Sequence, residues 1–138
     1  MALLEKYLVV KRSTLPNAGL GLFTRIFIAK GTRIIEYKGQ ISAWKQLEKK
    51  EWSNGYLFYV NRLHVINARP YKRSLARYAN DAKGLSKMKG VRNNCDYVTL
   101  DGRVFIEAKA NIRAGSEILV DYGKDYWRAI RYNQRLKT

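Results

Sequence analysis

Two segments of the sequence follow the same pattern, and each ends beside a tyrosine. Residues 27–39 read FIAKGTRIIEYKG and residues 111–123 read NIRAGSEILVDYG, so each runs Ile-x-x-Gly-x-x-Ile and closes on an acid, a tyrosine and a glycine. This pattern predicts a turn and a short buried strand that presents Tyr37 or Tyr122 at its end. Taken singly, such a tyrosine is more typical of a half-buried core residue with a hydrogen-bonded hydroxyl than of a functional group.

The sequence offers few residues for the commoner catalytic chemistries. One histidine, His64, and one cysteine, Cys95, cannot supply a zinc site of the usual nitrogen and sulfur ligands, so we expect no metal. A serine hydrolase would need His64 as its base, but no serine stands in a nucleophile elbow, and a core or surface histidine is the more ordinary interpretation. The lone cysteine also excludes a disulfide framework and fits a reducing compartment.

Two segments rich in glycine or asparagine could offer a backbone surface to a ligand. Ala18-Gly19-Leu20-Gly21 lacks the third glycine and the following helix of a dinucleotide-binding loop, so alone it is typical of a turn between close backbones. The second consists of ARYANDAKG and RNNCDYV, at 76–84 and 92–98, with small polar residues between aromatics. It suits recognition of a ligand edge or a loop stabilised by Asx turns.

The charge balance favours anionic partners. The chain has 27 Lys and Arg against 11 Asp and Glu, a formal net charge of +16. Between Arg69 and Arg92 there are eight basic residues and one acid, Asp81, and further basic residues recur at helical spacing within 124–135. This charge indicates nucleic acid, a ribosome surface or an acidic protein as a partner, with a solvated surface that has no specific partner as an equal alternative.

The elements that must position these residues are mostly short strands. We expect strands at 8–10, 22–27, 32–37, 56–60, 63–67 and 117–122, a hairpin over 97–107, and helices at 42–52 and 124–135. In the hairpin, Asp101-Gly102 suits a two-residue turn. The pattern predicts a mainly β single domain over residues 1–138, with several small sheets around a centre. The charged N-terminal segment favours neither a signal peptide nor a membrane span.

Four motifs, taken in order, resemble the SET-domain protein lysine methyltransferases. They are NAGLGLF, IAKGTRIIEYKG, the run from NARPYKRSLARYANDAKG to NNC, and GSEILVDYG. The resemblance runs from about Tyr7 to Trp127. It implies the SET-domain (β-clip) fold with a C-terminal pseudoknot, a core over 7–123 and a closing helix over 124–136.

The same resemblance implies roles for the tyrosines. Tyr122 would be the principal catalytic tyrosine, and Tyr37 and Tyr97 would be further walls of a channel for the substrate lysine. A free lysine with a pKa of about 10.4 is neutral only ~0.04% of the time at pH 7, a cost of roughly 4.6 kcal/mol. An aromatic channel and an adjacent sulfonium both disfavour the ammonium form, so no strong base is required.

S-adenosylmethionine would be the cofactor that the resemblance implies. Its contacts are expected at Ala18, Gly19, Leu20, Gly21, His64, Asn80, Asp81, Tyr126 and Trp127. Three features depart from the family pattern: Asp81-Ala82 stands where the family has His-Ser, Asn67 replaces an aspartate, and the Cys-rich zinc segment is absent. Tyr126 or Trp127 would then close the adenine pocket by stacking.

The sequence therefore predicts an S-adenosylmethionine-dependent methyltransferase that acts on lysine side chains of a protein. The alternative is a catalytically inactive SET-fold module that binds nucleic acid or acidic partners through its basic surface, and a methyltransferase with a non-protein acceptor is a further alternative. Because a basic surface repels lysine-rich tails, we expect docking on nucleic acid or an acidic surface through Arg69–Arg92 and the C-terminal helix. We expect a cytoplasmic protein, or a nuclear one in a eukaryote.

Overall fold

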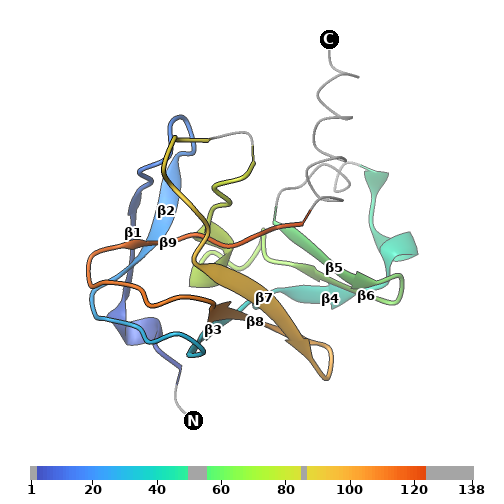
Figure 1. Ribbon diagram of the computed structural model, residues 1–138. Coiled ribbons are helices and arrows are strands. Elements are labelled where there is room, and N and C mark those ends of the chain that lie inside the picture. The colour runs from blue at the N-terminus through green and yellow to red at the C-terminus, as the bar shows by residue number, and fades with distance from the viewer. Residues whose placement is uncertain (1–2, 50–55, 85–86, 124–138) are drawn as a thin grey trace.

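The computed structural model describes residues 3–49, 56–84 and 87–123, which form short strands and 3-10 helices (Figure 1). In chain order the elements are η1 (Glu5–Tyr7), β1 (Leu8–Arg12), β2 (Leu20–Thr24), β3 (Arg33–Glu36), β4 (Gln40–Ser42), η2 (Trp44–Gln46), β5 (Leu57–Asn61), β6 (His64–Asn67), η4 (Leu75–Tyr78), β7 (Cys95–Leu100), β8 (Arg103–Ala108) and β9 (Glu117–Ile118).

The strands form three small sheets rather than one large one. Each sheet has three strands, in the orders β1-β2-β9, β3-β8-β7 and β4-β6-β5, and every pairing within them is antiparallel. Figure 1 shows the three sheets arranged around a common centre, with η4 behind them. The predicted mainly β fold of several small sheets is therefore confirmed.

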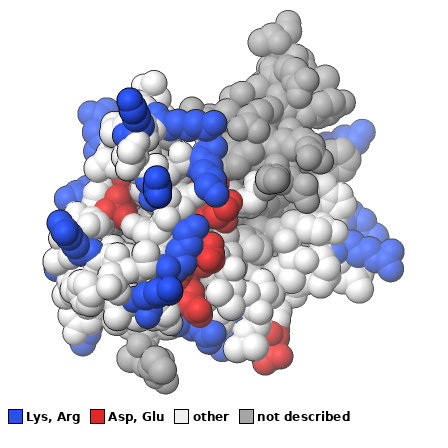
Figure 2. All heavy atoms as spheres, in the orientation of Figure 1, with Lys and Arg blue, Asp and Glu red and all other residues white. Residues whose placement is uncertain are grey.

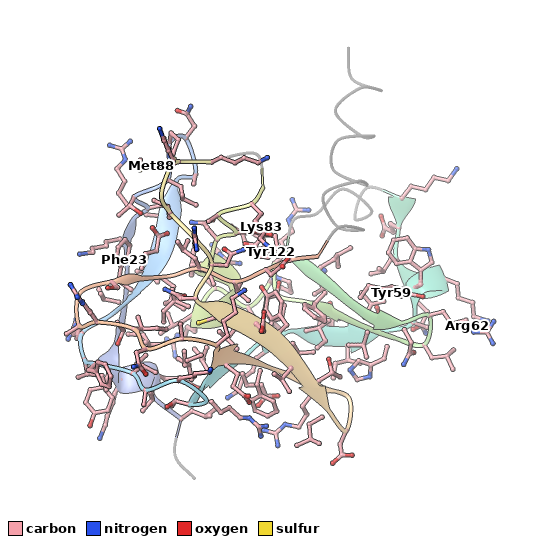
Figure 3. The ribbon with its side chains drawn as sticks, viewed as in Figure 1. Phe23, Tyr59, Arg62, Lys83, Met88 and Tyr122 are labelled. Carbon is pink, nitrogen blue, oxygen red and sulfur yellow. The ribbon has the colours of Figure 1, made fainter. Side chains whose placement is uncertain are left out.

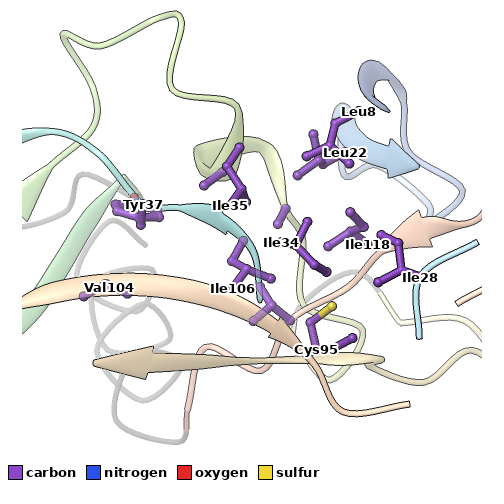
Figure 4. Close-up of a cluster of buried hydrophobic side chains, with 14 of the residues drawn as sticks. Leu8, Leu22, Ile28, Ile34, Ile35, Tyr37, Cys95, Val104, Ile106 and Ile118 are labelled. Atoms are coloured by element: carbon purple, nitrogen blue, oxygen red, sulfur yellow. The ribbon is translucent and has the colours of Figure 1, made fainter. Parts of the chain in front are cut away.

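The hydrophobic core lies where the sheets meet (Figure 4). Leu22 of β2, Ile34 of β3, Ile106 of β8 and Ile118 of β9 are all 0% exposed and belong to one buried cluster. Because β-branched and apolar side chains from different sheets pack against each other here, the short strands share one core although they do not share one hydrogen-bonded sheet.

The predicted hairpin is present as β7 and β8. Asp101 and Gly102 have φ angles of 51° and 77°, so both take the left-handed conformation of a two-residue hairpin turn. The register runs without a shift from Cys95 opposite Ala108 to Leu100 opposite Arg103.

Two predicted elements differ in the structure. The helix expected over 42–52 is wrong in its described part, because Ser42 belongs to β4 and Trp44–Gln46 form a 3-10 turn that ends before Leu47. The side chain of Gln46 accepts a hydrogen bond from the Ala43 N–H at 2.8 Å, which stabilises a tight turn. Strand β2 starts earlier than expected and ends at Thr24, whose hydroxyl bonds the backbone of Ile26 and bends the chain. The expected helix over 124–135 lies outside the described residues.

The segment after β9 passes between two parts of the chain that precede it. Val120 N–H donates to Asn80 O at 2.8 Å on one side, and Cys95 N–H donates to Leu119 O at 3.0 Å on the other. Both contacts are parallel bridges. This is the threading expected of the C-terminal pseudoknot, an exception to the rule against knotted chains. In the described part of the chain no helix is long and apolar enough to cross a membrane.

Candidate active site

Four aromatic side chains from different elements form a continuous chain of ring contacts. Tyr37 follows β3, Phe58 lies on β5, Tyr97 lies on β7 and Tyr122 follows β9. Tyr97 contacts the other three, with ring centroids 6.1 Å from Tyr37, 4.8 Å from Phe58 and 6.1 Å from Tyr122. The structure therefore brings together the three tyrosines that the sequence singled out and adds Phe58, at the junction of two sheets and the threaded segment. Figure 3 shows Tyr122 near the centre of the molecule, close to Lys83.

The two strand-end tyrosines have hydroxyl groups bound to backbone carbonyls. The Tyr37 hydroxyl donates to Tyr56 O at 2.7 Å, and the Tyr37 side chain is 5% exposed. The Tyr122 hydroxyl donates to Ala79 O, and Tyr122 is only partly buried. Tyr37 is therefore a fixed wall of the cluster, whereas Tyr122 stands at its more open end beside the segment that carries Asn80.

The glycine loop lies against this same segment. Asn17 and Gly19 have φ angles of 58° and 72°, which turn the chain sharply before β2. The Asn80 side-chain amide donates to Leu20 O at 3.0 Å. Ala18 packs on a small buried cluster that includes Ala82. The predicted cofactor-binding residues at 18–21 and at 80–81 are thus neighbours in the structure.

Glu117 joins the loop to the rest of the site, and the sequence analysis did not single it out. Its buried carboxylate accepts hydrogen bonds from Ser13 Oγ at 2.7 Å and from Thr14 N and Oγ1 at 2.9 and 2.6 Å. A Cβ at Gly21 would lie 2.3 Å from Glu117 Oε2, so a larger residue there would have to displace the Glu117 carboxylate from its hydrogen bonds. The signal was present in the sequence, because an acid inside the otherwise apolar GSEILV needs buried partners.

The side chain of Asp81 is turned into the protein. It is 3% exposed, and its carboxylate accepts hydrogen bonds from Lys83 N, Asn93 Nδ2 and Tyr122 N at 2.8, 2.8 and 2.9 Å. A contact between residue 81 and the cofactor therefore falls to its main chain, as the replacement of histidine by aspartate implied.

The remaining predicted residues lie elsewhere or outside the described chain. His64 begins β6 and its ring lies 3.3 Å from the position of a Cβ on Gly102, so its described contacts are with the β7–β8 turn rather than with the glycine loop. Its cofactor contact stays a prediction. Tyr126 and Trp127 lie outside the described residues.

Neither cysteine nor metal chemistry has support in the described part of the chain. Burial raises the pKa of the Cys95 thiol to about 12, so it is not a thiolate nucleophile at neutral pH. Among the residues that the structure describes, no group of three or more His, Cys, Asp or Glu side chains could hold a metal ion.

Basic side chains gather over one part of the visible face (Figure 2). Lysines and arginines are most numerous on the side that carries β1, β2 and the 80–95 loop, whereas the surface on the side of β5 is largely white, with a smaller group of basic side chains at its right-hand edge. Lys83, Lys87, Lys89 and Arg92 are all exposed on the 80–95 loop. Lys83 pairs with Asp121 at 3.6 Å, beside Tyr122, so the basic surface reaches the edge of the candidate site.

The glycine loop and Tyr122 leave backbone and ring surface open to a ligand. Nothing lies within 4 Å of where a Cβ on Gly19 would stand, so the loop offers open backbone beside Asn80. The aromatic cluster extends to the segment that carries Asn80 through Tyr122, and the face of a tyrosine ring can contact a cation.

Three small sheets around one core, a threaded C-terminal segment and an aromatic cluster beside a glycine loop define a class of domain. The SET domain family model matches residues 19–123, and the chain belongs to the SET-domain family. By sequence it is similar to the histone-lysine N-methyltransferase set-17 of Caenorhabditis elegans, 28% identical in an alignment of 123 residues that covers 85% of this chain. It is also similar to the histone-lysine N-methyltransferase EZH2 of Chaetomium thermophilum, 29% identical over 133 residues and 88% of this chain.

The chain spans 41% of the length of the first relative and 8% of that of the second. Among solved structures it is similar to the methyltransferase domain of human PR domain-containing protein 2. That match has a TM-score of 0.63 at 22% identity and covers 83% of this chain and 76% of the other. The match supports the fold, and the sequence relatives support a lysine methyltransferase family.

Proposed function

We propose that the chain is an S-adenosylmethionine-dependent methyltransferase that modifies lysine side chains of a protein. Family membership and the two histone-lysine methyltransferase relatives support this proposal. The observation that carries it is the position of Tyr122, which stacks on Tyr97 of the aromatic cluster and bonds Ala79 O next to Asn80. Tyr122 thus lies between the aromatic cluster and Asn80, which we propose to hold the cofactor.

The cofactor supplies a methyl group on a positively charged sulfur. Backbone groups of Ala18 to Leu20 would hold its methionine part, and Asn80 with the main chain of Asp81 would hold the adenine side. The Asn80 side chain is already fixed by Leu20 O, so this part of the site is formed without a ligand. Pre-formed polar groups reduce the entropy that binding costs.

The aromatic cluster would act on the acceptor lysine. The rings of Tyr37, Phe58 and Tyr97 exclude water, so burial disfavours the charged ammonium and releases its proton to solvent. The neutral amine held between these rings would then be able to accept the methyl group that the cofactor supplies. The Tyr122 oxygen can contact the methyl group through weak C–H···O interactions. By fixing the direction of the acceptor side chain, the aromatic walls would also contribute to the rate through positioning.

This proposal is tested by calorimetric titration of S-adenosylmethionine and by transfer of labelled methyl groups to a mixed cell extract. We expect saturable binding, and methyl-lysine after hydrolysis of the labelled protein. Asn80→Ala should weaken binding about tenfold or more through loss of its hydrogen bond. The control Asn61→Ala, in the β5–β6 turn, should not. Absence of binding at millimolar cofactor would contradict the proposal.

We also propose that the basic surface docks the enzyme on nucleic acid or on an acidic protein surface near the target lysine. Lys72 and Arg73 line a separate cavity of about 640 Å³, but Glu5 and Glu36 also line it, so the 80–95 loop is the more basic candidate. Polyanion binding releases counterions and so weakens steeply with salt.

The docking proposal is tested with a 20-base-pair duplex and with polyaspartate, from 50 to 200 mM salt. We expect Lys87→Gln with Lys89→Gln to reduce binding and to flatten its salt dependence. Lys45→Gln with Lys49→Gln, whose residues are also exposed, should have a smaller effect. Preference for polyaspartate would indicate an acidic protein, and methylation unaffected by salt and by either polyanion would contradict docking.

A further inference from the structure

The 79–81 segment holds Tyr122 at both ends. At the backbone, Tyr122 N–H donates to Asp81 Oδ2 at 2.9 Å. At the tip of the side chain, the Tyr122 hydroxyl donates to Ala79 O. Because Ala79 and Asp81 flank Asn80, any shift of this segment relative to Tyr122 must break one of these hydrogen bonds.

The second oxygen of Asp81 closes the 81–93 loop. Asp81 Oδ1 accepts from Asn93 Nδ2 and from Lys83 N, both at 2.8 Å, while Asn93 Oδ1 accepts from Ala82 N at 2.8 Å. The two oxygens of one carboxylate thus serve different purposes. Oδ1 fixes the loop, and Oδ2 fixes Tyr122.

Few side chains can perform both tasks at this position. Three N–H donors converge on the Asp81 carboxylate, which has four lone-pair sites, whereas a neutral imidazole has one acceptor and an amide has one acceptor oxygen. A carboxylate that is 3% exposed is stable only when such donors compensate its desolvation. Lys83, whose N–H belongs to this network, pairs through its side chain with Asp121 at 3.6 Å.

We propose that Asp81 is a positioning residue that sets the location of the Tyr122 phenol relative to Asn80 and the glycine loop at residues 18–21. This inference rests on the proposed methyltransferase function. It explains why aspartate can stand at position 81, where the family motif has histidine. In this chain the buried carboxylate of Asp81 fixes the position of Tyr122. The replacement therefore does not mark a lost site. Histidine at this position would leave at least one of the three converging donors without a partner.

The test compares Asp81→Asn and Asp81→His with two controls. Asn93→Ala opens the loop but leaves the bond from Asp81 to Tyr122, and Asp96→Asn makes the same acid-to-amide change at an exposed residue. We expect both Asp81 variants to lower kcat on the order of 10- to 100-fold, the range for a lost hydrogen bond to a charged group. The KM for S-adenosylmethionine should change less. Asp96→Asn should match wild type, and Asn93→Ala should lower Tm while kcat stays within about threefold.

A double-mutant cycle separates positioning from general destabilisation. If Asp81 acts through Tyr122, then Asp81→Asn should reduce the residual kcat of Tyr122→Phe by less than about threefold. Equal reductions of kcat in both backgrounds would overturn the proposal.

Amide hydrogen exchange at Tyr122 gives a readout that does not depend on activity. Exchange should be slow in wild type and Asn93→Ala and at least about tenfold faster in folded Asp81→Asn. Unchanged protection would also overturn the proposal. If the wild type transfers no methyl group, the proposed function fails, and the exchange rate still decides whether Asp81 holds Tyr122.

Discussion

The two segments that end in Tyr37 and Tyr122 begin alike and end differently. Their first isoleucines pair with each other, because Ile28 N–H donates to Ile112 O at 2.9 Å and Ile112 N–H donates to Ile28 O at 2.8 Å. Equivalent residues of the two segments thus meet across a local two-fold relation. The repeated sequence pattern has a structural basis in this pairing.

The likeness continues through the turn and into the core. Gly31 and Gly115 have φ angles of 89° and 87°, and Ile34 and Ile118 are both 0% exposed. Glycine is required by the positive φ, and the buried isoleucine anchors each strand in the shared core. Up to this point, local sequence determines the same local structure twice.

The segments then differ by one residue. Tyr37 follows Ile34 by three positions, whereas Tyr122 follows Ile118 by four. In an extended chain, an odd and an even spacing place side chains on opposite faces. Strand β3 continues along β8, but β9 ends at Ile118 and the chain passes between Asn80 and Cys95. Tertiary contacts therefore bury Tyr37 in the wall of the aromatic cluster, whereas they place Tyr122 beside the segment that carries Asn80.

The largest expected effect tests the shared core. Ile34→Ala and Ile118→Ala should each lower the free energy of unfolding by about 2–5 kcal/mol, because each leaves a cavity at a fully buried site. Urea denaturation measures both. Ile41→Ala is the matched control at a residue that is 60% exposed, and it should change stability by less than about 0.5 kcal/mol. If the free energy of unfolding fell only slightly for one of the two variants, the two segments would not anchor the core in the same way.

The turns should also respond alike. Gly31→Ala and Gly115→Ala should each destabilise by about 1–2 kcal/mol, because alanine is strained at positive φ although nothing lies within 4 Å of the new Cβ at either position. Thermal unfolding followed by circular dichroism is sufficient. If alanine is tolerated at one turn without cost, the two turns are not equivalent.

Much of the shared part could be predicted from sequence. The glycines, the alternation of apolar residues and the Asp101-Gly102 pair act locally, so they predicted β3, β7, β8 and the turn between the last two. The failures depended on distant partners. Ser42 of β4 pairs with Val65 of β6, which prevents the helix expected there, and the buried Glu117 depends on hydrogen bonds from Ser13 and Thr14.

At the candidate site, too, some features could be predicted from sequence and others depended on distant partners. The motif order predicted that the tyrosines and the loop at 18–21 would meet, because the family resemblance carries tertiary information. The structural role of Asp81 could not be read from sequence, since its three donors come from the 81–83 segment, Asn93 and Tyr122.

The hydroxyl of the buried tyrosine should contribute mainly to stability. Tyr37→Phe leaves Tyr56 O without its 2.7 Å hydrogen bond and should lower the free energy of unfolding by about 1 kcal/mol. Urea denaturation measures the change. Phe58→Leu removes a ring without a polar group and is the control for packing. A neutral Tyr37→Phe would show that this hydroxyl does not fix the wall.

The smallest effect concerns the acid before Tyr37. A hydrogen bond from Arg103 at 2.7 Å, together with its charge, lowers the pKa of Glu36 below its ordinary value of 4.5. Since the folded-state pKa is depressed, the pair stabilises the protein above the ordinary pKa and loses this contribution as pH falls through the folded-state value. The Tm difference between wild type and Glu36→Gln should therefore shrink below about pH 4.5 and in high salt. A difference independent of pH would contradict this.

The most direct test of the central claim compares Tyr122→Phe with Tyr37→Phe in labelled methyl transfer, with S-adenosylmethionine binding measured on the same preparations. We predict that both variants bind the cofactor, that Tyr122→Phe loses at least about 100-fold in transfer, and that Tyr37→Phe stays within about tenfold of wild type. Equal losses in the two folded variants, or full activity in Tyr122→Phe, would contradict the placement of Tyr122 at the reaction centre.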